Sequence, residues 1–151
     1  MPPDTLLNLR VTARAEVLQT IRRRLERVLA AAGISREAAH TLVVAVNEAC
    51  MNVIQHAYGE HRSGDLVLEV EADEEKLLFR LKDYAPRIDT QRLRGRDLEE
   101  VRPGGLGLPL IQQIMDEVHY PEPPPGIGNC LEMLKYRDRA VESNDGNPHQ
   151  Q

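Results

Sequence analysis

Residues 65–83 read DLVLEVEADEEKLLFRLKD, and this stretch decides the fold. Its two halves alternate apolar and polar side chains, which predicts two strands that each bury one face. The link between them, DEE, is short enough for a hairpin, and a hairpin joins antiparallel strands. We therefore expect an antiparallel sheet packed against a core on one side. The apolar residues on the shared face are Leu66, Leu68, Val70, Ala72, Leu77, Phe79 and Leu81.

Asp83 continues the apolar face of the second strand, where a carboxylate is unexpected. One interpretation is an Asp that ends the strand and caps the following turn. The other is a buried acceptor that points into a pocket and receives a hydrogen bond from an exocyclic amine. The residues alone leave both interpretations open.

Outside this hairpin, the periodicity predicts three helices and two further strands. Residues 7–11 alternate like a strand, and a helix with period 3.6 follows from Val17 to a cap at Gly33. Ser35 is a good N-cap for a second helix that we expect to run to about Tyr58 and stop at Gly59. A third helix is expected over 106–118, and CLEMLKY, 130–136, is the last strand. The order β, α, α, β, β, α, β predicts an α+β two-layer sandwich.

The second predicted helix carries a polar stripe within NEACMNVIQHAY, residues 47–58. Glu48, Asn52 and His56 follow one another at four-residue intervals, so they share one side of the helix. That side borders the arc of apolar residues, where a carboxylate is partly desolvated. The stripe is either an ordinary solvated edge or part of a site.

Three glycines, Gly104, Gly105 and Gly107, precede the third predicted helix. A glycine-rich helix start lets the backbone approach a ligand and offers free N–H groups that suit phosphate. No Lys-Ser/Thr follows, so this is not a Walker motif. A flexible hinge explains the same residues equally well.

Composition narrows the class of function. The net charge of −5 and the 3% content of aromatic residues argue against a nucleic-acid partner. We expect no membrane segment and no signal peptide, because no long apolar run and no basic-then-apolar start occurs. Cys50 and Cys130 are expected to be reduced core residues, which favours a cytoplasmic protein. We expect one domain over 1–137 and a polar, disordered tail over 138–151.

Three stretches together resemble a known superfamily. NEACMNVIQHAY, KDYAPRID and PGGLGLPLIQQIMDEVHY are similar to the N, G1 and G2 boxes of GHKL, or histidine-kinase-like, ATPases. Their spacing and the ending GIGNCLEMLKY most resemble the anti-sigma-factor serine kinases of bacterial partner-switching systems. The resemblance covers about residues 6–136. It implies a two-layer sandwich with a mostly antiparallel, mixed sheet and helices on one face.

The resemblance also implies roles for single residues. Glu48 would activate the attacking hydroxyl, and Asn52 would bind Mg²⁺ through its carbonyl oxygen. Asp83 would accept the adenine amine, and the small Ala85 would pass under the adenine. No catalytic role is implied for His56, for which we expect a structural hydrogen bond. The remaining nucleotide-binding positions are Gly104, Gly105, Gly107 and Leu108.

Two positions depart from the family pattern. The G1 box of the superfamily is Asp-x-Gly-x-Gly, and here both glycines are replaced in the sequence DYAPR, 83–87. We expect the protein still to bind nucleotide, although this change can lower the affinity. A Gly-Thr pair often precedes the core of the final strand, and here Asn129 follows Gly128. That replacement removes one hydroxyl near the adenine.

The resemblance implies a protein-serine kinase that binds MgATP and phosphorylates a serine on a STAS-type antagonist protein. It would alternately hold a sigma factor or another output protein, and it would form a homodimer. The rival is a binding module that switches partners without chemistry; a histidine-kinase catalytic fragment is a weaker third reading. The arginines between Arg87 and Arg102 are either a lid over the phosphates or a solvated loop balanced by nearby carboxylates, Asp89, Asp97, Glu99 and Glu100.

Overall fold

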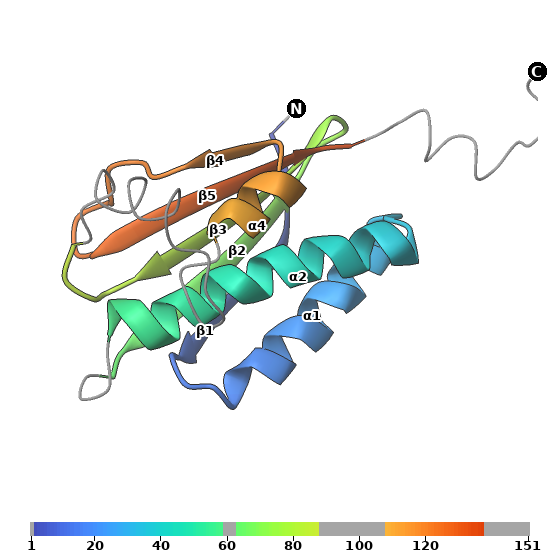
Figure 1. Ribbon diagram of the computed structural model, residues 1–151. Helices are drawn as coiled ribbons and strands as arrows, with labels where there is room; N and C mark the ends of the chain where they lie inside the picture. Colours follow the sequence, from blue (N-terminus) through green and yellow to red (C-terminus); the bar gives the residue numbers. More distant parts are fainter. Residues whose placement is uncertain (1, 59–62, 88–107, 138–151) are drawn as a thin grey trace, which may run out of the picture.

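The computed structural model describes residues 2–58, 63–87 and 108–137. Its centre is a five-stranded sheet in the order β1-β2-β3-β5-β4, in which each pair of neighbours is antiparallel (Figure 1). The α+β fold class predicted from the sequence is confirmed. The strands are β1 (Asp4–Thr12), β2 (Asp65–Ala72), β3 (Lys76–Asp83), β4 (Glu117–His119) and β5 (Asn129–Tyr136).

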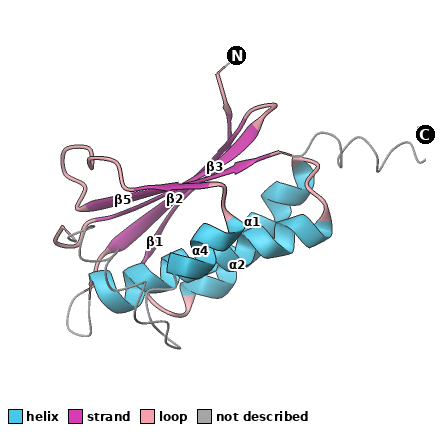
Figure 2. Cartoon of the chain, turned by 45° about the horizontal axis from the view of Figure 1, so that its top comes forward, coloured by secondary structure: helices cyan, strands magenta, loops and turns pink. Residues whose placement is uncertain are grey.

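The helices form a second layer on one face of the sheet (Figure 2). They are α1 (Val17–Ala31), α2 (Arg36–Asn52) with the π-helical turn η1 (Val53–Ala57), and α4 (Leu108–Ile114). Their ends follow the sequence signals. Gly33 adopts a positive φ of 85° just after α1, and the Ser35 side chain accepts a hydrogen bond from the Ala38 N–H at the start of α2.

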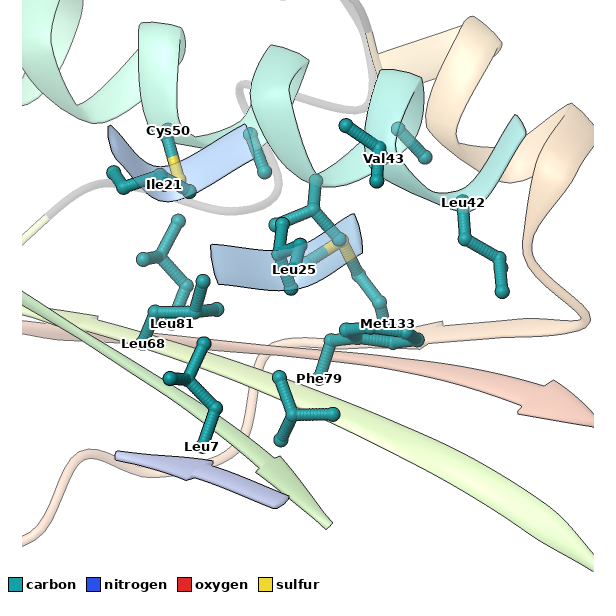
Figure 3. Close-up of a cluster of buried hydrophobic side chains, with 14 of the residues drawn as sticks. Leu7, Ile21, Leu25, Leu42, Val43, Cys50, Leu68, Phe79, Leu81 and Met133 are labelled. Atoms are coloured by element: carbon teal, nitrogen blue, oxygen red, sulfur yellow. The ribbon is translucent and has the colours of Figure 1, made fainter. Parts of the chain in front are cut away.

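The core lies between the two layers, and the alternation seen in residues 65–83 sets its sheet side (Figure 3). Phe79 sits in the middle strand and is fully buried, with Val70 on β2 and Met133 on β5 paired with it on the same face. Ile21 and Leu25 of α1 cover this face together with the apolar side of α2. Alternating strand residues thus meet helix residues at period 3.6, as the sequence predicts.

Both cysteines lie inside the fold as free thiols. Cys50 is fully buried on α2, and burial raises the pKa of its thiol to about 12. Cys130 is buried on β5, and burial raises the pKa of its thiol as well. A thiol with a raised pKa carries little thiolate at neutral pH, which suits the expected role as reduced core residues.

The open face of the sheet carries charged side chains. Arg80 at its centre contacts Glu69 of β2 at 3.2 Å and Glu132 of β5 at 2.8 Å, and Lys82 also contacts Glu69 at 3.1 Å. This ladder across three strands is the polar half of the alternation seen in the sequence. In the described part of the chain, no helix combines the length and apolar character needed to cross a membrane.

The prediction of one helix over 106–118 was wrong at its C-terminal end. The described helix stops at Ile114, and Glu117–His119 forms β4 at the edge of the sheet. Val118 pairs with Met133 of β5, so its apolar side chain serves the same core from a strand. A short apolar run fits either period, and pairing with β5 decides between them.

The prediction for the second helix was correct in extent but not in detail. Its α-helical part ends at Asn52, and a π-helical turn continues to Ala57, closed by the Tyr58 N–H bonding to the Val53 carbonyl at 3.3 Å. The expected stop at Gly59, the loop over 88–107 and the C-terminal tail lie outside the described residues.

Candidate nucleotide-binding site

Asp83 ends β3 with its side chain on the helix-facing side of the sheet. It is 3% exposed, and it is the only buried charged side chain among the described residues. Its Oδ1 accepts hydrogen bonds from the Ala85 backbone N–H and from the Asn129 side-chain amide, both at 2.9 Å. Burial raises the pKa of Asp83, and these two bonds act in the opposite direction. The site therefore holds a carboxylate in fixed orientation and short of solvent.

The turn after Asp83 packs tightly against the start of β5. Ala85 is buried, and the Gly128 N–H donates to the Asp83 carbonyl at 2.8 Å. A Cβ added to Gly128 would lie only 1.8 Å from the Ala85 carbonyl oxygen, so only glycine fits. The altered G1 stretch is thus held against β5 by main-chain contact.

Tyr58 fastens the end of the helix to the same corner of the sheet. Its hydroxyl donates to the Asp65 carbonyl at 2.6 Å and accepts from the Tyr84 N–H at 2.8 Å. Its ring lies so close to Gly64 that a Cβ there would meet it at 2.4 Å. The π-helical turn before Tyr58 therefore ends where β2 begins and β3 ends. Such turns occur often at functional sites.

The polar stripe runs along the rim of this corner. Glu48 and Asn52 are half-buried on α2, whereas His56 is exposed on η1. The half-burial of Glu48 and Asn52 agrees with the predicted position of the stripe beside the buried face. Whether its three residues have the roles that the family resemblance implies stays a prediction.

A cavity of about 130 Å³ opens between α2 and the ends of β3 and β5. Apolar side chains such as Val53 and Leu81 form much of its wall. The polar and charged lining residues are Asn52, His56, Asp83, Arg87, Tyr120 and Asn129. An apolar slot with one buried acceptor suits a flat ring that carries an amino group, and the amide at the rim can serve a hydrated cation.

The structure brings together some of the predicted site residues. Asn52, Asp83 and Leu108 line the cavity, and Ala85 lies behind Asp83 as a donor to it. Glu48 stands one helical turn from Asn52 and does not line the cavity. The predicted phosphate glycines, Gly104, Gly105 and Gly107, lie outside the described residues.

Arg87 has a partner that the sequence did not suggest. Its guanidinium forms a two-pronged ion pair with Glu122, with N–O distances of 3.0 and 2.5 Å. Both side chains are exposed, and the contact ties the turn after β3 to the proline-rich connection before β5. The other arginines of the expected lid, up to Arg102, are outside the described residues.

Sequence reasoning missed two residues of the site. The sequence pattern marks Asn129 only as the loss of a hydroxyl, although its amide supplies a donor to Asp83. The signal was available in the register, because an antiparallel pairing of β3 with β5 sets Asp83 opposite Asn129. Tyr58 is expected from the sequence only as a helix end, and no pattern in the sequence points to the backbone groups that its hydroxyl bonds.

The antiparallel sheet backed by helices, with its buried strand-end carboxylate beside a helix bearing Glu48 and Asn52, defines an α+β domain of the GHKL ATPase class. The chain belongs to the family described as histidine kinase-like ATPase domain, whose model matches residues 11–135. The resemblance seen in the sequence is thereby confirmed.

Curated relatives cover nearly the whole chain. It is 33% identical to the serine-protein kinase RsbW of Listeria innocua, over 91% of this chain and 92% of the relative. It is 31% identical to the protein of the same name from Staphylococcus aureus, over 95% and 94% of the two chains. The corresponding protein of Bacillus cereus is 29% identical, over 94% and 91%.

Proposed function

We propose that this protein is a serine-protein kinase of a partner-switching system, which binds MgATP and phosphorylates a serine on a STAS-type antagonist. The observation that carries the proposal is the buried, oriented carboxylate of Asp83 facing the cavity. An acceptor that is desolvated and held by two donors suits an exocyclic amine such as that of adenine. The names of the relatives support the choice of serine-protein kinase within the family.

Asn52 fits the role of Mg²⁺ ligand through its side-chain carbonyl oxygen, since Mg²⁺ prefers oxygen ligands. Within the described part of the chain, no group of three or more His, Cys, Asp or Glu residues could hold a metal by itself. The ion would therefore be held jointly by Asn52, water and the phosphates of the nucleotide, as is usual for Mg²⁺. When bound, it neutralises charge on the phosphates during transfer.

Glu48 fits the role of general base. It lies one turn before Asn52, which corresponds to a rise of about 6 Å along the helix. The Glu48 carboxylate would accept the proton of the serine hydroxyl as the serine oxygen bonds to the γ-phosphorus. The bond between that phosphorus and the leaving ADP oxygen breaks at the same time. A base and a metal ligand on one helix can serve both ends of this transfer.

The test is phosphoryl transfer by the purified full chain. Incubation with labelled MgATP and candidate STAS proteins should yield one phosphoserine per antagonist, located by mass spectrometry. Asn52→Ala should lower both MgATP affinity and transfer, because it removes a metal ligand. Asn8→Ala, an exposed change on the distant strand β1, is the matched control and should alter neither.

A second candidate function is a binding module that switches partners without chemistry. The observation that favours it is the G1 stretch, which lacks both glycines of the family pattern. Wild-type protein that binds ATP but leaves the serines of all tested STAS proteins unmodified would support the module and contradict the kinase.

The partners follow as part of the same proposal. We infer a homodimer that holds a sigma factor or another output protein and releases it for the antagonist. Arg22, Arg23, Arg24 and Arg27 are exposed on α1, near the end that the resemblance links to partner contact. Light scattering should report a dimer, and a monomer at all concentrations would remove this part. Crosslinks to the antagonist should fall within residues 84–105.

A further inference from the structure

Three acceptors converge on the side-chain amide of Asn129. Its Nδ2 lies 2.9 Å from Asp83 Oδ1, 3.1 Å from the Pro86 carbonyl and 3.5 Å from the Ala85 carbonyl. All three partners are oxygens that only accept, so the amide must present its NH₂ group to them. Its two hydrogens match the two shorter contacts.

These contacts close a clip between β5 and the turn after β3. The Gly128 N–H holds the Asp83 carbonyl, and the next residue, Asn129, holds the Asp83 side chain and the Pro86 carbonyl. The clip spans the stretch in which the family glycines are replaced. The amide therefore connects, through one side chain, the carboxylate that faces the cavity and the backbone that follows it.

The clip also leaves one oxygen of Asp83 to accept a hydrogen bond from a ligand. Oδ1 already accepts two hydrogen bonds, from Ala85 and Asn129. Among the residues that the structure describes, donors reach Oδ1 and not Oδ2. A carboxylate oxygen that holds two donors has its in-plane positions filled. The second oxygen is thus the one that can accept from a ligand in the cavity that Asp83 lines.

We propose that Asn129 is a positioning residue that sets the preference of the site for a base with an exocyclic amine. It does so by orienting Asp83 and by tying residues 83–86 to β5. The inference rests on the proposed nucleotide-binding function and goes beyond it, because it assigns the base preference to a side chain that need not touch the base. A purely structural asparagine would support all ligands of the cavity alike.

The experiment compares ATP and GTP, since guanine presents a carbonyl where adenine presents its amine. Asn129→Leu keeps a side chain of similar size without donors, and Asn129→Thr restores one donor to Asp83 but not the reach to Pro86. Dissociation constants for both Mg-nucleotides are measured by calorimetry on the full chain. Thermal melting confirms that each variant is folded, and Asn8→Ala serves as the distant asparagine control.

In Asn129→Leu, affinity for ATP should fall by about 10- to 100-fold, the effect of losing a hydrogen bond to a charged group. Affinity for GTP should stay within about twofold, so Asn129→Leu should lose the preference for ATP over GTP. Asn129→Thr should recover most of that preference. Equal losses for both nucleotides, or an unchanged ratio in Asn129→Leu, would overturn the assignment of Asn129 alone. Wild-type protein that binds neither nucleotide would instead refute the proposed function, and the inference with it.

Discussion

The Asp83 end of the sheet and Asn52 of the polar stripe line one cavity, but the two regions are built in different ways. Asp83 is buried and bonded to a backbone N–H and to a side chain from another strand. Glu48 and Asn52 are half-buried and carried by a single helix. The proposed binding of the base is therefore linked to the packing of the sheet, whereas the proposed chemistry depends on half-buried side chains of one helix.

The largest expected effect tests the stripe. Glu48→Gln keeps the shape of the side chain and removes its basicity, so phosphoryl transfer should fall by about 10²–10⁴-fold. ATP affinity and antagonist binding should stay nearly unchanged. Initial rates with labelled ATP measure the first quantity and calorimetry the second. Glu37→Gln, an exposed change in the first turn of the same helix, is the matched control. An unchanged rate in Glu48→Gln would place the base elsewhere.

The next effect tests the packing of the Asp83 end. Gly128→Ala forces a Cβ against the Ala85 carbonyl and should lower the free energy of unfolding by about 1–3 kcal/mol, measured in urea. ATP affinity should fall with it. Gly126→Ala is the comparison in the same connection, because a Cβ there meets nothing within 4 Å although φ is 85°. That change should lower the free energy of unfolding by about 1–2 kcal/mol, because alanine is strained at this positive φ, and it should leave ATP affinity unchanged. Equal losses of ATP affinity in both variants would contradict the link between the packing at Gly128 and ATP binding.

A smaller effect tests whether the helix end is fastened to the sheet. Tyr58→Phe removes a buried hydroxyl that bonds two backbone groups, so the free energy of unfolding should fall by about 1–2 kcal/mol. Tyr136→Phe is the matched control. The residue is 52% exposed and its hydroxyl bonds Glu117 at the surface, so the free energy of unfolding in urea should shift by less than about 0.5 kcal/mol. Similar losses of unfolding free energy in both variants would show that the hydrogen bonds of the Tyr58 hydroxyl do not stabilise the fold.

The smallest effect concerns pH. Burial raises the pKa of Asp83, so the folded state binds more protons than the unfolded state from about pH 3.9 upward to the raised value. The contribution of Asp83 to the free energy of unfolding therefore falls as pH rises through that window. Asp83→Asn does not titrate and should remove this fall, leaving the ligand-free protein at least as stable as wild type at pH 7.

Urea unfolding across pH measures this difference, which should vanish well below about pH 3.9, where the Asp83 carboxyl is protonated in both the folded and the unfolded state. An Asp83→Asn variant that is markedly less stable at pH 7 would mean that the ionised carboxylate stabilises the fold. The Asp83 end would then be a structural feature first and a binding site second.

The sequence predicted most of the fold because its signals are local. Alternation in residues 65–83, the N-cap at Ser35 and the positive φ at Gly33 each depend on a few neighbours in the chain. Strand β4 was missed because three residues carry too little periodicity, and only pairing with β5 makes them a strand. The site residues divide in the same way, into those with a local sequence signal and those that depend on tertiary contacts.

The spacing of Glu48 and Asn52 is visible in one helix, and Asp83 stands out as a charge on an apolar face. Asn129 and Tyr58 act through partners 46 and 26 residues away, on other elements, so their roles depend on the tertiary register. Only the assembled fold shows that the Asn129 amide donates a hydrogen bond to Asp83.

The most direct test of the account is a calorimetric titration of wild type and Asp83→Asn with MgATP and MgGTP. Wild type should prefer ATP. Asp83→Asn should weaken ATP binding by about tenfold or more and leave GTP binding nearly unchanged, because a charged acceptor for the amine is lost. Equal affinity of wild type for the two nucleotides, or unchanged ATP affinity in Asp83→Asn, would contradict the assignment of this cavity as an adenine site.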